Sequence, residues 1–413
     1  MDILYISYDG LTDFIGQSQI LPYLLGCASA GYRLTVISFE KPERKALLGQ
    51  EVEQRCREAR IDWLPQTFRN KPPYLAKYLD QLTMRRAAKT ASANTRFDLL
   101  HCRSYPAAVA GLAIKQLFGT PLLFDMRGFW PDQRREGGRW SAASPVGRWL
   151  YAQWKRHEAR LISNADHIVS LTDAGRREIE RWPAYRGAPI SVIPCCADFE
   201  HFKVADEESR HLAREKLEIS PDAPVLAYLG SLGTVYMIAE HLRLFQAIRR
   251  HHHRAKALFV GRDQASDLLS IAAQYGVELD AGDLRVVHAE RDVVPFWLGA
   301  ADVGSCFIIP TFSSKGVSPT KLAEYLACGI PVIANHSVGD VQRIVRSLDA
   351  GHIVTGFDDQ QIAGAAEAFF ALRSVDRTAL RNRARPTLDL PNAVTAYLDI
   401  YRDLRTAVSA GAW

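Results

Sequence analysis

The alternation of short apolar runs with helical segments is the feature that most constrains the fold of this chain. In the first half, apolar runs cover residues 3–6, 34–38, 98–104 and 121–128, and helical patterns separate them. The same alternation begins again near Val225, with further apolar runs at 257–262, 284–288 and 302–308. Continuous apolar runs are typical of parallel strands that are buried on both faces. Their alternation with helices predicts an α/β fold with two Rossmann-like, doubly wound domains.

Composition narrows the class of protein. The chain has 413 residues, 47% hydrophobic and 23% charged, as expected of a globular protein with a large core. A net charge of +5 favours anionic partners, but no Lys/Arg block predicts a nucleic-acid ligand. The seven cysteines form no Cys-x-x-Cys pair, which argues against zinc ribbons and fits a reducing compartment. The N-terminus starts directly with a strand pattern and no apolar stretch is long enough to span a bilayer, so we expect a cytoplasmic protein.

Polar side chains follow two neighbouring strands of the first half. His101 and Arg103 end one strand, and Asp125 and Arg127 end another. The carboxyl ends of parallel strands form the edge at which ligands bind in open α/β sheets. A structural role for a single His or Arg is an alternative, but four such residues together predict a site. The first unit lacks Gly-x-Gly-x-x-Gly, so no dinucleotide fingerprint is present.

The stretch from Gly316 to Ile333 is predicted to be a loop, a helix and a buried strand. Ser318 or Thr320 is positioned to cap the helix, whose first turn offers free backbone N–H groups and the Lys321 ammonium to a phosphate. Glu324 lies one turn further on the same face, where a carboxylate can accept bonds from vicinal hydroxyls such as those of a ribose. A capped surface helix with a solvated glutamate is the alternative interpretation.

A glycine loop opens the second half. Gly230, Ser231 and Gly233 follow the first strand, and the glycines allow backbone N–H groups to approach a phosphate closely. Arg262 ends the next strand. A tight turn that binds nothing would have the same sequence. The helix predicted over residues 146–164 is basic and aromatic, and it also has two interpretations. We prefer a polar face exposed to solvent, and a contact with a membrane surface is the minority alternative.

Taken in order, these segments resemble the GT-B glycosyltransferases of family 4. The resemblance rests on Gly16, on Val192-Ile193-Pro194 with Asp198 and Phe202, on the Gly230 loop, on Ala300-Ala301-Asp302-Val303 and on the string from Glu324 to Val332. It implies two Rossmann-like domains facing each other across a cleft, over residues 1–194 and 195–392, joined by a linker at Cys195–Phe202. It also implies that a final helix, about residues 393–413, completes the first domain.

The same resemblance implies residue roles and exposes departures. Glu324 would hold the donor ribose, and the loops containing Gly16 with Gln17 and Gly230 would flank the diphosphate. The family's second Glu is Gly316 here, its Arg and Lys after the glycine loop are Ser231 and Tyr236, and its usual His is replaced by Arg127. We hypothesise that Lys315, Lys321 and Arg262 supply the missing positive charge to the diphosphate.

The function expected from this resemblance is retaining transfer of a sugar by a hexosyltransferase-type enzyme. The donor would be a UDP- or GDP-sugar and the acceptor a hydroxyl of a glycan, a lipid-linked saccharide or a polysaccharide precursor. Asp125 is the candidate acceptor-side carboxylate, with Arg127 and Arg103 orienting the substrates. No Asp-x-Asp string is evident, so we expect neither a metal nor another cofactor. A phosphorylase or epimerase on the same fold, or an inactive scaffold, is the alternative. The location would be cytoplasmic, with peripheral contact at the inner face of a membrane as one variant.

Overall fold

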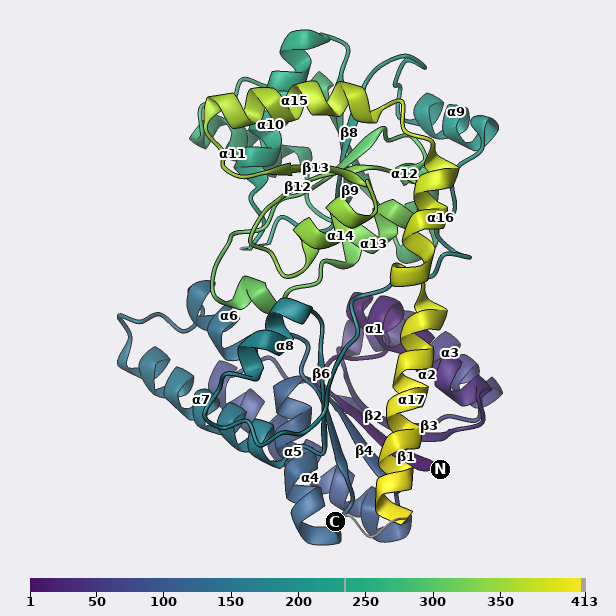
Figure 1. The fold of residues 1–413 in the computed structure, drawn as a ribbon, viewed down its shortest axis with the longest axis vertical. Helices are drawn as coiled ribbons and strands as arrows, with labels where there is room; N and C mark the ends of the chain where they lie inside the picture. The colour runs from purple at the N-terminus through teal and green to yellow at the C-terminus, as the bar shows by residue number, and fades with distance from the viewer. Residues whose placement is uncertain (234, 410–413) are drawn as a thin grey trace. The chain divides into compact units, whose positions relative to one another are not determined.

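The computed structural model describes residues 1–233 and 235–409, and it divides into two units (Figure 1). Unit 1 comprises residues 1–194 and the segment from Pro391 onward, and unit 2 comprises Cys195–Leu390. Each unit is a parallel sheet covered by helices on both faces, the doubly wound arrangement that the alternating pattern predicts.

The sheet of unit 1 has seven strands in the order β3-β2-β1-β4-β5-β6-β7. Strand β1 lies between β2 and β4, parallel to both, so the chain order reverses beside it. The strands are β1 (Asp2–Ser7), β2 (Arg33–Glu40), β3 (Asp62–Thr67), β4 (Leu99–Arg103), β5 (Leu122–Asp125), β6 (His167–Ser170) and β7 (Ile190–Val192).

The helices of unit 1 include one that returns from the far end of the chain. Helix α17 (Leu390–Ser409) follows all of unit 2 in sequence but packs on α2, where a Cβ added to Gly26 would lie 2.7 Å from Val394 Cγ2. The other helices are α1 (Phe14–Gln19), α2 (Leu21–Ser29), α3 (Pro42–Glu58), α4 (Pro73–Asn94), α5 (Ser104–Phe118), α6 (Trp130–Glu136), α7 (Pro145–Asn164) and α8 (Asp173–Ile179).

The sheet of unit 2 has six strands in the order β10-β9-β8-β11-β12-β13. Its strands are β8 (Val225–Leu229), β9 (Lys256–Gly261), β10 (Leu284–His288), β11 (Val303–Cys306), β12 (Val332–Asn335) and β13 (Gly351–Val354). Its α-helices are α9 (Glu207–Lys216), α10 (Ile238–His251), α11 (Ala265–Gln274), α12 (Val294–Leu298), α13 (Thr320–Ala327), α14 (Val341–Ser347), α15 (Asp359–Leu372) and α16 (Arg377–Leu388), with 3-10 turns η1 (Ala281–Asp283), η2 (Arg291–Val293) and η3 (Ser313–Gly316).

The continuous apolar strands explain why the central strands of both sheets are buried. Every residue of β4, β5, β8, β11 and β12 is buried, which requires helices on both faces. Helix α13 supplies one such cover, since its residues Leu322, Tyr325 and Leu326 belong to the core of unit 2. Gly329 ends that helix with φ +67°, a conformation that favours glycine. The predicted order of loop, helix and strand is therefore confirmed.

Two local predictions are wrong. The start of α13 is not capped by a hydroxyl: Pro319 holds the N-cap position, and Ser318 Oγ instead accepts a hydrogen bond of 3.1 Å from Cys195 N. Gly16, predicted to lie in a loop, lies inside α1.

The segment predicted to be a linker is part of the second core. Ala197, Phe199 and Phe202 are buried in the hydrophobic cluster of unit 2, and Ala197 forms a bridge with Asp389. Apolar side chains therefore hold Cys195–Phe202 against unit 2. Among the helices described, none has the length and apolar character required to cross a bilayer.

Candidate functional site

The site candidates lie at the carboxyl edges of the two sheets, one set in each unit. Arg103 and Asp125 end β4 and β5 of unit 1, and Arg127 lies just beyond β5. In unit 2, Gly230 follows β8, Arg262 follows β9, and α13 carries Thr320, Lys321 and Glu324.

Asp125 is the centre of the unit 1 set. Its Oδ2 atom lies 3.8 Å from Arg103 Nη1 and 3.7 Å from His101 Nε2, and its Oδ1 atom lies 3.8 Å from Arg127 Nη1. Tyr397 of α17 donates a hydrogen bond of 3.2 Å to Oδ2. Strand β4, strand β5 and the returning helix therefore converge on one buried carboxylate.

Two arginines and the imidazole of His101 keep that carboxylate ionised. Burial alone would raise the pKa of Asp125, but Arg127, His101 and Arg103 together outweigh burial and hold the pKa below its usual value. Burial lowers the pKa of His101, so the imidazole favours its neutral form despite the adjacent carboxylate. Asp125 Oδ1, His101 Nε2 and Arg103 Nε have no hydrogen-bond partner among the described residues. The set offers a negative charge and unused donors at the sheet edge.

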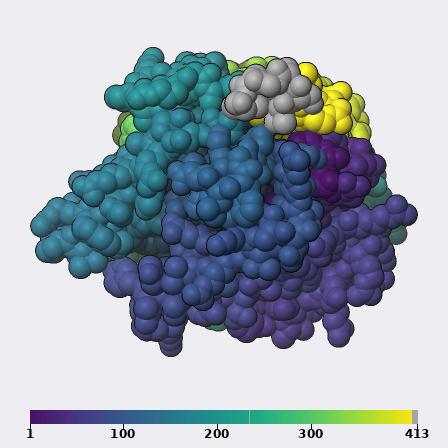
Figure 2. Space-filling model, turned by 90° about the horizontal axis from the view of Figure 1, so that it is seen from below, coloured from purple at the N-terminus to yellow at the C-terminus, as the bar shows by residue number. Residues whose placement is uncertain are grey.

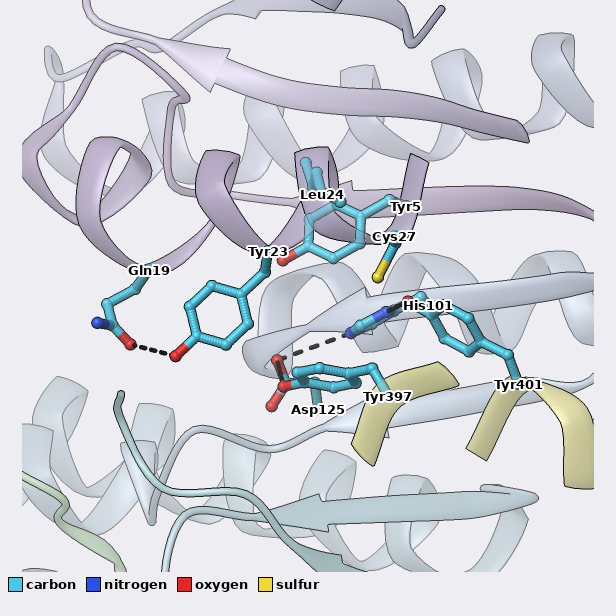
Figure 3. A pocket seen from close by; sticks show the side chains of 9 residues that line it. All are labelled: Tyr5, Gln19, Tyr23, Leu24, Cys27, His101, Asp125, Tyr397 and Tyr401. Carbon is cyan, nitrogen blue, oxygen red and sulfur yellow. Dashed lines mark hydrogen bonds and ion pairs between the residues drawn. The ribbon is translucent and has the colours of Figure 1, made fainter. Parts of the chain in front are cut away.

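A small cavity adjoins this set, and α17 forms one of its walls (Figure 3). His101 Nδ1 lies 2.7 Å from Tyr401 OH, and Tyr23 OH donates to Gln19 Oε1 over 3.5 Å. The rings of Tyr397 and His101 face each other, with centroids 5.1 Å apart. The cavity is lined by Tyr5, Gln19, Tyr23, Leu24, Cys27, His101, Asp125, Tyr397 and Tyr401.

Backbone strain marks the ends of β4 and β5. Arg127 has φ +56° and Ser104 has φ +65°, values that non-glycine residues rarely adopt. At Arg127 this conformation directs the guanidinium toward Asp125 and within 3.4 Å of Gln19 Oε1. Such strain is often concentrated at functional positions, and the role of Arg127 in a site stays a prediction.

Lys321 is the most unusual side chain of the unit 2 set. The residue is 6% exposed, and its ammonium lies 3.9 Å from the ring centroids of both Tyr228 and Tyr236. A Cβ added to Gly230 would lie 3.6 Å from Lys321 Nζ, so the ammonium is beside the glycine loop. Nζ has no hydrogen-bond acceptor among the described residues, and burial lowers the pKa of Lys321 to about 8.

Glu324 lies one helical turn beyond Lys321, and Arg291 holds its carboxylate. Arg291 Nη1 lies 3.6 Å from Glu324 Oε1, while burial raises the pKa of Glu324. Neither Arg291 nor the two tyrosine rings around Lys321 were predicted as members of this set. Tyr236 stands where the resemblance expects a lysine, and the ammonium of Lys321 lies 3.9 Å from the centroid of its ring.

Several predicted donor residues are already engaged inside their units. Gln17 Nε2 donates a bond of 2.7 Å to Leu11 O, and Gly16 packs so closely that an added Cβ would lie 2.0 Å from Gly10 O. In the glycine loop, the amide of Leu232 donates to Asp263 Oδ2 over 2.9 Å. The amide of Leu232, one of those expected to contact phosphate, therefore already donates to a carboxylate of the protein.

The remaining predicted residues lie at the surface of the glycine loop and of η3. Ser231 and Gly233 are exposed, and Tyr228 OH donates 2.7 Å to Ser231 O. Arg262 is exposed, with Nη2 3.7 Å from Glu290 Oε1. Lys315 is exposed on η3, with Nζ 4.9 Å from the Phe312 ring centroid. The structure therefore brings Lys321, not Lys315, to the glycine loop; the donor-binding roles of all these residues stay predictions.

Within residues 1–233 and 235–409, no group of three or more His, Cys, Asp or Glu side chains is arranged to hold a metal ion. The expectation of a reaction without cofactors stays a prediction.

Each unit of the chain matches a known family of glycosyl transferase domains. Residues 18–196 match the glycosyl transferase 4-like domain, and residues 223–371 match the glycosyl transferases group 1 domain. A similar curated protein is D-inositol 3-phosphate glycosyltransferase 2 of Catenulispora acidiphila, 24% identical over 320 residues, which cover 74% of this chain and 70% of the relative. The protein of Paenarthrobacter aurescens named D-inositol 3-phosphate glycosyltransferase is also 24% identical, over 67% of this chain and 64% of its own.

Solved structures share the fold of the whole chain. Sucrose-phosphate synthase from Thermosynechococcus elongatus has a TM-score of 0.69 and 16% identity, covering 98% of this chain and 100% of its own. The Anabaena protein HepE in complex with UDP-glucose has a TM-score of 0.68 and 17% identity, covering 98% and 100%. WaaG, a glycosyltransferase involved in lipopolysaccharide biosynthesis, has a TM-score of 0.65 and 14% identity, covering 96% and 99%.

Proposed function

Because the chain belongs to the family 4 glycosyltransferases of GT-B fold, we propose that it transfers a hexose from a nucleoside-diphosphate donor to an acceptor hydroxyl, with retention at the anomeric carbon. The family establishes a hexosyltransferase-type enzyme, and the donor, stereochemistry and acceptor class form the proposal. UDP-sugars are the first donors to test, since the similar HepE structures are complexes with UDP and UDP-glucose. We include a hydroxyl of a small cyclic polyol among the candidate acceptors, because the curated relatives are named inositol 3-phosphate glycosyltransferases.

The observation that carries the donor proposal is the ammonium of Lys321 beside the Gly230 loop. It is buried over two aromatic rings, and no acceptor within the described part of the chain bonds to it, so it holds three donors for an incoming anion. The first turn of α13 adds backbone N–H groups with no partner inside the helix. A diphosphate in this place would receive both kinds of donor.

Charge on the leaving diphosphate gives these groups a role in the reaction. When the bond between the sugar and the diphosphate breaks, negative charge grows on the departing oxygen, and fixed donors stabilise that charge more than the ground state. Lys321 would therefore assist departure as well as binding. Glu324, one turn further, is the proposed acceptor of hydrogen bonds from the ribose hydroxyls.

Asp125 is the proposed acceptor-side carboxylate. Its ionised state suits stabilisation of positive charge on an oxocarbenium-like sugar, and Arg103 and Arg127 are placed to orient substrate hydroxyls. Tyr397 donates a hydrogen bond to the carboxylate and His101 Nε2 lies 3.7 Å from it, which makes them its proposed positioning residues.

The test is an assay of nucleotide release. The protein would be incubated with UDP-glucose and GDP-mannose, with and without myo-inositol, inositol 3-phosphate and extracted lipid-linked saccharides. If the protein transfers the sugar, the release of free nucleotide should require the acceptor. With an α-linked donor, NMR of the product should show an α linkage. Conversion of the donor without acceptor would instead favour an epimerase, and release only with inorganic phosphate would favour a phosphorylase. No reaction together with retained UDP binding would favour an inactive scaffold.

A peripheral membrane contact is proposed at α4 as well as α7. The first turns of α4 expose Tyr74 (64%), Leu75 (52%) and Tyr78 (61%), and α7 exposes Trp149 (61%). The exposed positions of α4 further include Arg85, Arg86 and Lys89 but no acidic residue. Aromatic and basic side chains on one helix are typical of a helix at an anionic lipid surface. In Figure 2 the blue surface of this part of unit 1 faces the viewer.

Liposome flotation tests the membrane contact. The protein should float with vesicles of phosphatidylglycerol and less with vesicles of phosphatidylcholine, and Leu75→Ser with Tyr78→Ser should reduce flotation severalfold. Equal flotation of this variant and the native protein would exclude α4 as the contact, and the corresponding Trp149→Ser variant would then report on α7.

A further inference from the structure

A buried network of ion pairs and hydrogen bonds joins the helices α5, α6 and α7 of unit 1. At its centre Lys155 of α7 donates to Asp132 Oδ2 of α6 over 3.1 Å and forms an ion pair with Glu158. Tyr151 OH donates to Asp132 Oδ1 over 2.7 Å, and Tyr105 OH of α5 donates to Glu158 Oε1 over 2.6 Å. We call these five residues the Lys155 network.

Burial makes the members of the network depend on one another. Glu158 is 2% exposed and Asp132 is also buried. Burial raises the pKa of Glu158 more than Lys155 and Tyr105 lower it. Burial lowers the pKa of Lys155, but the charges of Glu158 and Asp132 outweigh it and raise that pKa, so the ammonium stays charged. Removal of one partner would leave a buried charge uncompensated, so the network holds the three helices in one arrangement.

Two members of the network adjoin the strained ends of β4 and β5. Tyr105 directly follows Ser104, whose φ is +65°, and Ser104 directly follows Arg103. Asp132 lies in the first turn of α6, shortly after Arg127, whose φ is +56°. Non-glycine residues keep such conformations only where the surrounding structure holds them. The network is fixed to the chain directly beyond both strained positions.

Aromatic contacts connect the network to the backbone at the end of β5. The ring of Trp130, the first residue of α6, has its centroid 6.0 Å from that of Tyr105 and 4.7 Å from that of Trp154 on α7. The amide of Trp130 donates to the carbonyl of Gly128 over 3.1 Å. A shift of α6 against α7 would therefore move the backbone next to Arg127.

We propose that the Lys155 network is a positioning device, which holds the ends of β4 and β5 in the conformation that directs Arg103 and Arg127 toward Asp125. The inference rests on the proposed function, because it takes Asp125 and the two arginines as groups of the reaction centre. Each guanidinium lies 3.8 Å from the carboxylate. A small displacement at this distance changes both the electrostatic interaction and the alignment of a substrate. Tyr105 and the other members are positioning residues, since they act through the backbone of the strand ends.

His101 reports the position of the two arginines without requiring activity. The charge of Asp125 raises the pKa of His101, whereas the charges of Arg103 and Arg127 lower it. If either arginine moves away, the pKa of His101 should therefore rise. The same cavity is also lined by the uncharged side chains of Tyr5, Tyr23, Cys27, Tyr397 and Tyr401.

The test compares Asp132→Asn and Glu158→Gln in the full chain. Each replacement keeps an oxygen for the tyrosine hydroxyl and removes one charge from the network. Arg156→Gln is the control for a change of charge on α7, because Arg156 is exposed. Val52→Ala is the control for a loss of stability, because Val52 is buried on α3 outside the network.

Three measurements are made on every variant. NMR titration gives the pKa of His101, and calorimetry gives the affinity for UDP. Nucleotide release from UDP-glucose, with inositol 3-phosphate as the acceptor probe, gives kcat and KM. Circular dichroism melting verifies folding. If a charge variant does not fold, Tyr151→Phe, which removes one hydroxyl and no charge, takes its place with the same expected direction.

In both network variants we expect the pKa of His101 to rise by about half a pH unit or more, because nearby charges set that pKa. The kcat should fall about tenfold or more, since small misplacement of orienting groups is costly. The KM for UDP-glucose and the affinity for UDP should stay close to native, because Lys321 and Glu324 lie in unit 2. Both controls should leave kcat and the pKa of His101 unchanged.

Replacement of Ser104 tests the route through the backbone. Glycine adopts a positive φ without the steric cost that serine bears. In the Glu158→Gln background, Ser104→Gly should therefore recover a large part of the change in the pKa of His101, and Ser104→Ala should recover none.

Three results would overturn the inference. These are a native pKa of His101 with native kcat in both network variants, equal losses in Val52→Ala, which would reduce the effect to general stability, and recovery by Ser104→Ala as large as by Ser104→Gly. The proposed function fails separately, through absence of UDP binding or of any sugar transfer. In that case the titration of His101 still decides whether the network positions the two arginines, because it requires no substrate.

Discussion

Lys321 carries a positive charge in a place where burial disfavours it. Among the described residues, the faces of Tyr228 and Tyr236 and the more distant carboxylate of Glu324 compensate this charge. Contacts between an ammonium and aromatic rings contribute about 0.5–2 kcal/mol each, less than the cost of full desolvation. A residue of this kind lowers stability unless a ligand uses it, so affinity and stability should respond to its removal in opposite directions.

Lys321→Met preserves the length of the side chain and removes the charge. We expect UDP to bind at least tenfold more weakly, because a hydrogen bond to a charged group contributes about 1.5–3 kcal/mol. The thermal midpoint of the free protein should rise, because the methionine is not penalised by burial. Calorimetry and thermal melting measure the two effects, and Lys216→Met, at an exposed position of α9, is the control. Unchanged UDP affinity would remove Lys321 from the donor site.

The pH dependence follows from the same side chain. The folded pKa of about 8 lies below the value of 10.5 expected for the unfolded chain. Between these values the unfolded chain binds the extra proton, so this group increases the stability of the free protein as the pH rises from about 8 to 10.5. UDP affinity should do the opposite and fall as Lys321 loses its proton above about pH 8. Titrations at pH 7 and 9 compare the native protein with Lys321→Arg, in which the loss should be much smaller.

Glu324 is tested by removing the hydroxyls it is proposed to hold. The native protein should bind 2′,3′-dideoxy-UDP at least tenfold more weakly than UDP, whereas Glu324→Ala should bind both nucleotides with similar affinity. The exposed Glu367 of α15 provides a control, Glu367→Ala, which should retain the discrimination. If Glu324→Ala discriminated as strongly as the native protein, the ribose would have another partner.

Among the elements, α1 is held by close backbone packing that only glycine permits. A Cβ added to Gly16 would lie 2.0 Å from Gly10 O and 2.6 Å from Leu11 C, both backbone atoms that cannot move aside easily. The same turn is fixed by Glu40, whose carboxylate accepts from the amides of Leu11 and Thr12 over 2.8 and 3.0 Å. The loop after β1 is therefore a rigid part of unit 1.

Gly16→Ala should destabilise unit 1 by about 1–3 kcal/mol or more, the usual cost of overpacking. Gly364→Ala is the matched control: Gly364 lies inside α15 with nothing within 4 Å of an added Cβ, and alanine should stabilise it by up to about 1 kcal/mol. Urea denaturation measures both variants. Equal stability of Gly16→Ala and the native protein would contradict the packing argument.

The sequence pattern predicted these elements well where a local signal exists. The apolar runs identified the buried strands, and the spacing of Lys321 and Glu324 placed both on one helix. Arg103, Asp125 and Arg127 were expected together at a sheet edge, and in the structure each arginine lies 3.8 Å from the carboxylate of Asp125.

What the sequence could not predict depends on contacts between distant segments. Tyr401 forms a hydrogen bond with His101, which is 300 residues away in the sequence. Lys321 is covered by the ring of Tyr228 from β8 and by the ring of Tyr236 from the segment before α10. Ser318 was expected to cap α13 because its hydroxyl suits that position, but the amide of Cys195 competes successfully for it. Local propensity contains no information about such competitors.

At the scale of the whole molecule, the boundary between the units is crossed twice. The chain leaves unit 1 after Pro194 and returns at Pro391. Unit 2 is thus one continuous segment with its own core, whereas unit 1 requires α17. Buried side chains of α17 include Ala393, Tyr397, Ile400 and Tyr401, which would leave an apolar face of unit 1 exposed if they were absent.

Separate expression of the segments tests this division. Residues 195–390 should fold alone, unfold cooperatively and bind UDP within about tenfold of the affinity of the full chain. Residues 1–194 alone should aggregate, and fusion of the segment from Pro391 onward through a glycine–serine linker should restore a monomer by size exclusion. A stable, monomeric 1–194 fragment would show that α17 is dispensable for unit 1.

The return of α17 also sets the order in which a ribosome can complete the two units. Residues 195–390 emerge contiguously and can acquire their native core as soon as they leave the exit tunnel. The seven strands of unit 1 emerge earlier, yet they must wait for the translation of almost two hundred further residues before Tyr397 and Tyr401 reach Asp125 and His101. The domain made first is therefore finished last, and during that interval its incomplete face is a natural binding site for chaperones.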